Sequence, residues 1–442
     1  MSETPFGRRL RALRRQRALS QNELAGSELS ASYVSLLESG KRPPTEEAVV
    51  KLAARLGISV AELVGDTGVV PSRPTLEQPL EAELLLNRAL LALRTGSADV
   101  AAGMFAELAA VDDDTLALQA RTLLGRAQAL EWAGRLAEAA DLYRQWLDLF
   151  ADGCDDPVLR VETVISLLRC QRETGAPRMA AKEAEEALAA ADELALSGTP
   201  VGLELAGIVA GFRWDLGQDT AALDLLEEAY GTADGLVGRA DLAQAYGRAA
   251  DAAEARGRLA HAVALARRGA EVCHRADALC PVARLRLAGA EVLARRSATA
   301  TGPASQPPLE PYAAELAAWG SPLDAAVAEA ERSRELLATG DAEGARNAAH
   351  SALDSVGPAW RRTRAHASLA LGRALWRLGD AAGVRYFEEA ADALAAVGAE
   401  RQSAAAYLEL AELLETEGDV RGALSYYRRA SAVVGLLPAE SS

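Results

Sequence analysis

Apolar residues recur at helical spacing through the first 65 positions, and turn signals divide this stretch into five predicted helices. The helices are expected to begin at about residues 6, 21, 31, 45 and 60. Ser20 and Ser30 stand where N-cap residues stand, and Gly40 and Gly57 stand where helices end. The stretch therefore predicts a small all-helical domain at residues 1–65.

The rest of the chain, from Leu80 to about residue 436, repeats a second apolar pattern with a period near 40. A glycine marks the turn of each unit, a small residue usually precedes it by seven positions, and alanine follows it by five positions in all cases but Val384. These glycines are Gly96, Gly134, Gly175, Gly217, Gly257, Gly340, Gly379 and Gly418. The double gap between Gly257 and Gly340 implies a concealed turn near residue 298, so we predict nine helical hairpins.

Three segments lack this periodicity. Residues 66–79 contain three prolines and are interpreted as a linker, residues 298–309 as a Pro/Gly/Ser-rich insertion, and residues 437–442 as a tail. The repeat array then covers residues 80–436.

The net charge of −16 divides unevenly between the two domains. Residues 1–65 contain ten basic and seven acidic residues, a charge of +3, which leaves 37 basic and 56 acidic residues, or −19, for the remainder. Six arginines lie close together, at positions 8, 9, 11, 14, 15 and 17. Such a run is typical of a solvated helix face, and it also fits contact with phosphates, which we favour here.

Other chemistry is sparse. The four cysteines have no disulfide or zinc spacing, and Cys273, His274 and Cys280 with His261 match no familiar ligand set. We find no nucleophile elbow, His/Glu zinc motif or phosphate-binding loop, and therefore expect no catalytic residue, no metal and no cofactor. Because no apolar run approaches the length of a membrane span, we expect a cytoplasmic bacterial protein without a membrane partner.

The stretch Leu19–Pro44 resembles the Cro/repressor class of helix-turn-helix domains, also called the xenobiotic-response-element family. The matching residues are Leu-Ser-Gln-x-x-Leu-Ala followed by Ser-x-x-Tyr-Val-Ser-x-x-Glu-x-Gly-Lys-Arg-x-Pro. The resemblance implies a five-helix domain whose third helix enters the major groove of double-stranded operator DNA. It assigns DNA contact to Gln21, Ser30, Ala31, Ser32, Tyr33, Ser35, Lys41 and Arg42, with Ser30 chiefly a cap and Tyr33, Lys41 and Arg42 facing phosphates. It also implies an internal ion pair between Arg14 and Glu38.

The repeats resemble a tetratricopeptide array with longer helices, which implies a right-handed α-solenoid whose first helices line a concave surface. Residues three and six positions before each turn are expected on that lining. Those that could hold an anionic or peptidic effector are Gln128, Arg169, Arg172, Trp214, Arg373 and Trp376. Each of them taken alone is also compatible with an ordinary lining role.

This order of domains is similar to that of the peptide-pheromone-responsive regulators of Gram-positive bacteria. We therefore predict a homodimeric, sequence-specific transcriptional regulator whose repeat domain senses a peptide or small-molecule effector. Two alternatives stay open: a protein-interaction scaffold in which DNA binding is secondary, and an antitoxin-type autoregulator.

Overall fold

The computed structural model describes residues 5–17, 19–26, 29–41, 44, 46–58, 63, 78–110, 116–150, 154–175, 177–275, 277–288 and 310–436. The described residues form helices and turns, with no strand among them, as the sequence predicts. The chain divides into two compact units, residues 1–88 and 89–442. We call the helix-turn-helix part of the first unit the head and the second unit the array.

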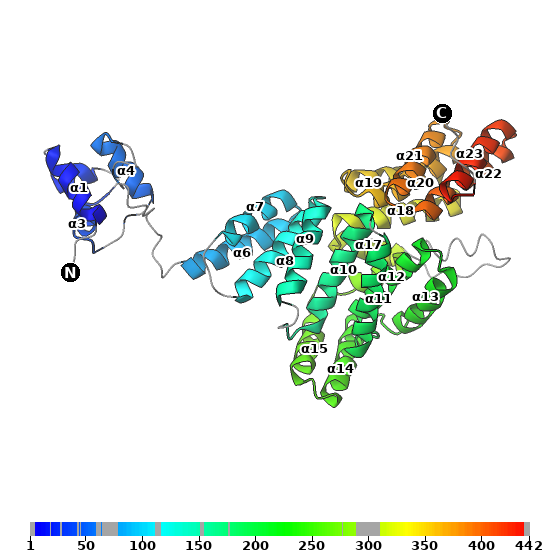
Figure 1. Cartoon of the computed structure of the whole chain (residues 1–442), viewed down its shortest axis with the longest axis horizontal. Coiled ribbons are helices and arrows are strands. Elements are labelled where there is room, and N and C mark those ends of the chain that lie inside the picture. Colours follow the sequence, from blue (N-terminus) through cyan, green and yellow to red (C-terminus); the bar gives the residue numbers. More distant parts are fainter. Residues whose placement is uncertain are drawn as a thin grey trace. The chain divides into compact units, whose positions relative to one another are not determined.

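The head consists of short helices around one apolar core (Figure 1). Leu10, Leu24, Val34, Leu37 and Leu52 are fully buried at its centre. Ser20 and Glu23 form a reciprocal capping box at the second helix, and the Ser30 hydroxyl accepts the Tyr33 N–H at the third. The helices are α1 (Pro5–Gln16), α2 (Gln21–Ala25), α3 (Ala31–Glu38) and α4 (Glu46–Leu56).

The predicted closing helix and linker fall mostly outside the described residues. Leu63 is helical and fully buried against the core of the head. The helix α6 begins at Gln78, two residues before the predicted start of the array, and runs to Arg94 across the boundary between the units. The insertion at 298–309 and the tail at 437–442 lie outside the described residues.

The array is a succession of antiparallel helical hairpins. The turns are the eight predicted glycines, all of which have positive φ, the conformation that glycine adopts at least cost. A ninth pair, formed by the helical segment 280–288 and α17, flanks residues 289–309, so the concealed turn near 298 is not described. The remaining helices are α7 (Ala98–Ala109), α8 (Leu116–Trp132), α9 (Leu136–Phe150), α10 (Pro157–Thr174), α11 (Pro177–Glu193), α12 (Pro200–Asp215), α13 (Asp219–Ala233), α14 (Arg239–Ala255), α15 (Leu259–Val272), α17 (Glu310–Trp319), α18 (Pro322–Thr339), α19 (Ala342–Ser355), α20 (Arg361–Arg377), α21 (Ala382–Ala396), α22 (Glu400–Thr416) and α23 (Val420–Val433).

Small residues allow the paired helices to approach closely. The alanine five positions after the turn is fully buried in most hairpins, as at Ala101, Ala139 and Ala345. At Gly372, a Cβ atom would lie 2.9 Å from Cδ2 of Phe387 and 3.2 Å from the carbonyl oxygen of Gly383. The small-residue pattern in the sequence thus reports the helix spacing within each hairpin.

The array also makes contacts between hairpins that are distant in sequence. Two of its C-terminal helices return to helices nearer its middle: α20 contacts α10, and α22 contacts α12. The course of the helices along the array can be followed in Figure 1. A linear array in which each repeat contacts only its neighbours would lack these contacts.

Candidate functional site

The orientation of α3 in the head is fixed by one buried carboxylate, that of Glu38. Arg14 Nε and Nη2 donate to its two oxygens at 2.5 and 3.0 Å, and Gln21 Nε2 donates at 2.8 Å. Burial raises the pKa of the Glu38 carboxyl, but these hydrogen bonds outweigh burial and hold the pKa below its usual value. The ion pair that the resemblance implies is therefore present, and it joins α1, α2 and α3.

Close packing of α1 against the end of α3 supports the same arrangement. A Cβ atom at Gly7 would lie 2.5 Å from the carbonyl oxygen of Leu37 and 2.7 Å from that of Glu38. Because glycine has no side chain at this position, α1 can lie directly on the last turn of α3.

The opposite face of α3 is accessible and carries serines together with the exposed Leu36. Ser32 and Ser35 are exposed, whereas Ala31 is half-buried and Val34 and Leu37 face the core. A short helix with small hydroxylated residues on its free face has the dimensions and chemistry for the major groove. These two serines are the best placed of the predicted DNA contacts.

The other predicted contacts differ in their accessibility. Ser30 is exposed and caps α3, and Lys41 is also exposed. Tyr33 is half-buried against the core of the head, and the side-chain amide of Gln21 is held by Glu38. Arg42 lies outside the described residues.

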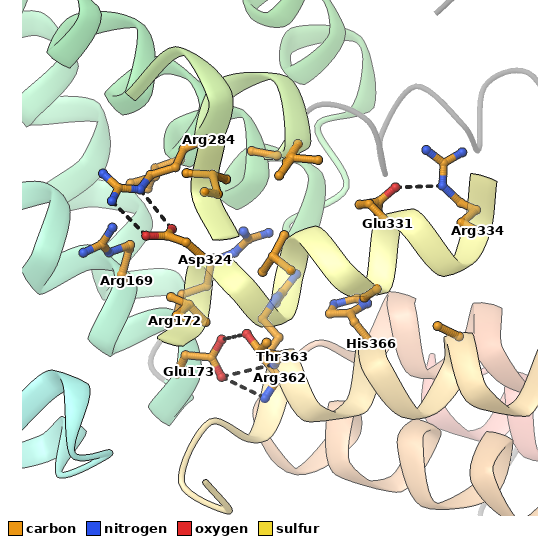
Figure 2. Close-up of a pocket in the computed structure, with 18 of the residues that line it drawn as sticks. Arg169, Arg172, Glu173, Arg284, Asp324, Glu331, Arg334, Arg362, Thr363 and His366 are labelled. Carbon is orange, nitrogen blue, oxygen red and sulfur yellow. Dashed lines mark hydrogen bonds and ion pairs between the residues drawn. The ribbon is translucent and has the colours of Figure 1, made fainter. Parts of the chain in front are cut away.

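The array contains a cavity of about 410 Å³ (Figure 2). Its walls come from α10, α12, the segment 280–288, α17, α18 and α20. All of these except α17 are first helices of their hairpins, the class that the resemblance places on the concave surface. The volume lies within the range of about 300–1,000 Å³ that is typical of small-molecule pockets.

Three of the predicted ligand residues line this cavity, namely Arg169, Arg172 and Arg373. The other three do not line it: Trp214 and Trp376 are half-buried against the apolar cores of the array, and Gln128 is half-buried on α8. Large apolar rings gain more by packing between helices than by facing a charged cavity, which accounts for the position of the two tryptophans.

The sequence reasoning missed most of the cavity wall, although a signal for it exists. In α12, α18 and α20, part of the lining stands 13, 9 and 6 positions before the turn glycine. The one exception is Gly211, which stands at such a position but does not line the cavity. Spacings of four and three residues place these positions on one face of a helix. The residues are Glu204 and Ile208 on α12, Val327, Glu331 and Arg334 on α18, and His366, Ala370 and Arg373 on α20. Arg334 and Arg373 stand at the predicted position six residues before the turn, and extending the predicted face by two turns toward the helix N-terminus would have found the others.

A buried carboxylate beside the cavity, Asp215 at the end of α12, joins helices that lie far apart in the sequence. It accepts hydrogen bonds from Arg172 on α10 at 3.1 and 3.4 Å, from Arg362 on α20 at 2.7 Å and from Gln402 on α22 at 2.9 Å. Its side chain is only 1% exposed. Burial raises the pKa of Asp215, but the two guanidinium groups lower it by more than burial raises it. The pKa of Asp215 is therefore below its usual value.

A second buried carboxylate, Glu173 of α10, caps a helix that begins 188 residues later in the chain. Its oxygens accept the N–H groups of Arg362 and Thr363 at 2.9 and 3.3 Å and the Thr363 hydroxyl at 2.6 Å (Figure 2). These N–H groups belong to the first turn of α20, where helices lack internal partners, and the α20 N-cap residue Trp360 makes no side-chain cap. We call Arg172, Glu173, Asp215, Arg362, Thr363 and Gln402 the clasp.

Among the residues that the structure describes, no group of three or more His, Cys, Asp or Glu side chains is arranged to hold a metal ion. None of the described helices combines the length and the apolar character that crossing a membrane requires.

Comparisons with known proteins concern mainly the head. A family described as a helix-turn-helix domain matches residues 5–64. The uncharacterized HTH-type transcriptional regulator RghRB of Bacillus subtilis is 40% identical over 73 residues, which cover 16% of this chain and 52% of RghRB, about half its length. The uncharacterized HTH-type transcriptional regulator y4dJ of Sinorhizobium fredii is 45% identical over 60 residues, 13% of this chain and 78% of y4dJ.

A solved structure is similar over a larger part of the chain. It is that of Bacillus thuringiensis PlcR in complex with the peptide PapR7 and DNA, at 13% identity, with 67% of this chain and 99% of that chain covered. Its TM-score of 0.29 is too low to support a conclusion about binding. The similarity of the head to y4dJ and to the helix-turn-helix domain is sufficient by itself, and the chain belongs to the family of HTH-type transcriptional regulators.

Proposed function

We propose that the protein is a sequence-specific transcriptional regulator that binds operator DNA through α3. The observation that carries the proposal is the exposed Ser32–Ser35 face of a helix whose opposite side is fixed by Glu38. Specific readout requires a helix that presents base-contacting groups in one fixed orientation. The exposed arginines of α1 would add phosphate contacts, which position a protein on DNA without reading sequence.

The protein is proposed to act as a homodimer on paired half-sites. One short recognition helix contacts few base pairs, so two heads related by a two-fold axis supply the missing specificity. The half-site centres would then lie about 34–36 Å apart, or a multiple of that distance.

The array is proposed to sense an effector in the cavity. Residues from α10 to α20 line it, and Arg172, Glu173, Arg362 and Thr363 belong both to its wall and to the clasp. A ligand that binds the closed and opened clasp with different affinities would change the shape of the array. Such couplings are typically worth about 1–3 kcal/mol.

Selection of DNA from random duplexes with the purified full chain tests the proposal. We expect enrichment of a two-fold symmetric site whose affinity falls steeply with salt. Ser32→Glu should weaken binding to that site by at least about a hundredfold, because a carboxylate would face phosphates and base acceptors. Ser351→Glu, the same charge change at an exposed position of α19, is the matched control and should bind normally. Failure to enrich any sequence, or normal binding by Ser32→Glu, would refute the proposed role of α3.

A second candidate function is a protein-interaction scaffold. The observation in its favour is an apolar stripe on α6, where Leu80, Leu84 and Leu91 are 68%, 59% and 64% exposed. An apolar stripe of this kind is typical of a protein contact. Sedimentation of Leu84→Glu/Leu91→Glu against the unchanged chain tests whether the stripe holds a second copy. If the substitutions dissociate a dimer, the stripe is the interface of the proposed homodimer. If the dimer is unaffected, the stripe is available to bind a different protein.

A further inference from the structure

The wall of the cavity is divided by chemistry. One part is apolar and comes from five elements, with Ile208, Leu287, Leu316, Leu323, Val327 and Leu369. The other part carries six arginines and four carboxylates. A cavity of this kind suits a molecule with an apolar body and a charged group.

The four carboxylates on the wall are already engaged. Arg284 donates to Asp324 at 2.9 and 2.8 Å and to Glu204 at 3.1 and 3.2 Å (Figure 2). Glu173 accepts three hydrogen bonds at the start of α20, and Glu331 accepts one from Arg334 at 2.8 Å. A cationic ligand would have to displace these partners, so the cavity is unsuited to a positive charge.

The arginines of the wall differ from the carboxylates, because the guanidinium group of Arg169 has N–H donors that make no hydrogen bond. Its Nη2 donates to Glu131 at 3.0 Å, whereas its Nε and Nη1 are buried and make no hydrogen bond. Nη1 forms a long ion pair with Glu204, at 3.6 Å, but no hydrogen bond. A buried guanidinium with unused donors is costly, and an anionic oxygen that meets these donors when the Arg169 side chain turns toward the cavity it lines would remove that cost.

The wall is poorly suited to a peptide backbone. A buried peptide needs partners for both its N–H and C=O groups along its length. Among the described lining residues there is no asparagine or glutamine, and Thr363, the one hydroxyl residue, already donates to Glu173. His366 is the other neutral hydrogen-bonding side chain on the described wall, and one imidazole cannot pair with the successive N–H and C=O groups of a backbone.

We propose that the cavity binds a small amphipathic organic anion, with its carboxylate or equivalent acidic group on Arg169 and its apolar body against Ile208, Leu287 and Val327. The proposal rests on the proposed role of the array as the effector-binding unit and names the chemical class of the effector. It assigns to Arg169 the recognition of the charged group and to the apolar wall the selection of the body.

Titration calorimetry with the full chain tests the class of ligand. The probes are decanoate and 2-naphthoate, each compared with the alcohol and the amine of the same carbon skeleton. We expect at least one acid to bind at least about tenfold more tightly than its alcohol, and the amines not to bind. Equal binding of acid and alcohol, preference for an amine, or no binding by either acid would overturn the proposal.

Two variants locate the bound probe. Arg169→Met alone would leave Glu131 buried without its cation, so the substitution is combined with Glu131→Gln, which can still accept from Tyr143. This double variant should lose about tenfold or more of the affinity for the acid and none of that for the alcohol. Ala330→Phe, which adds a ring to the wall of the cavity, should abolish binding of both.

Ala338→Phe, at an exposed position of the same helix α18, is the control for the added ring and should bind the probes normally. Undiminished binding of the acid by either cavity variant would place it elsewhere and overturn the proposal. The DNA assay separates this outcome from failure of the proposed function. If the acid binds in the cavity without changing operator affinity, the ligand class stands and the effector role falls.

Discussion

The head and the array both depend on buried carboxylates that accept from arginine, but they join segments at very different distances along the chain. In the head, Arg14 reaches Glu38 within a few helices, 24 residues away. In the array, Asp215 accepts a hydrogen bond from Arg362, which is 147 residues away in the sequence. A small domain with one apolar core needs such a pair only to orient a helix. In the array, the polar groups of the clasp join hairpins that lie far apart in the sequence, beside close approaches such as that of Gly175 to Val397.

The largest effect is expected from removing the central acceptor of the clasp. Asp215→Ala leaves two buried guanidinium groups without their carboxylate and should lower the free energy of unfolding of the array by about 3–5 kcal/mol. All six tryptophans lie between residues 132 and 376, so tryptophan fluorescence during urea unfolding reports on the array alone. Asp219→Ala, which removes the exposed pair with Arg401, should cost less than about 1 kcal/mol. Equal losses in the two variants would show that the clasp is no different from a surface ion pair.

Acid should abolish the advantage that Asp215 gives. The folded-state pKa of Asp215 is below its usual value of about 3.8, so its contribution is complete above that pH and is lost as the pH falls through the lower, folded value. The difference in melting temperature between the unchanged chain and Asp215→Asn should therefore be constant from pH 7 to about pH 5 and shrink below about pH 4. A difference that does not vary with pH would mean that Asp215 acts through its shape and not through its charge.

A smaller loss is expected from breaking the pair in the head. Arg14→Ala strands Glu38 and should destabilise the head by about 2 kcal/mol, seen in far-ultraviolet circular dichroism as an earlier loss of helix. The exposed neighbour Arg15 is the control, and its replacement by alanine should have little effect. The tryptophan transition of the array should not move in either variant. A shift of that transition in Arg14→Ala would show that the stability of the array depends on that of the head.

The smallest effect is expected from adding a single methyl group between paired helices. Gly372→Ala forces a Cβ atom against Phe387 and should cost about 1–3 kcal/mol. Gly103→Ala in α7 meets open space and should stabilise the chain by about 0.5–1 kcal/mol, because alanine is the better helix former. Urea unfolding followed by tryptophan fluorescence measures both. A gain at Gly372 would mean that the helix spacing in the hairpins is not set by small residues.

The sequence predicted those features that depend on neighbouring residues. The caps at Ser20 and Ser30, the pair of Arg14 with Glu38 and the eight turn glycines all follow from local spacing or from a motif, and all are present. The position of three arginines on the cavity wall also followed from their distance to a turn. Local backbone chemistry is written in short stretches of sequence, which is why these features could be found.

The clasp could not be found in this way. Arg361, Arg362 and Arg364 look like an ordinary charged helix face, and nothing near Asp215 or Glu173 in the sequence indicates partners far along the chain. The positions of Trp214 and Trp376 were assigned by the same rule that succeeded for the arginines, yet the rule ignores how much a large ring gains by packing between helices. Contacts at long range depend on how far the row of hairpins curves, which no short stretch of sequence specifies.

The capping of α20 by Glu173 has a consequence for how the protein is made. Chains emerge from the ribosome N-terminus first, and domains generally fold in that order. Glu173 therefore gains its hydrogen-bond donors only after Arg362 and Thr363 have been synthesised. The set of donors to Asp215 is complete later still, after Gln402 has been added. A nascent chain can complete its head long before its array closes, so premature termination would release a DNA-binding domain without the part that is proposed to control it.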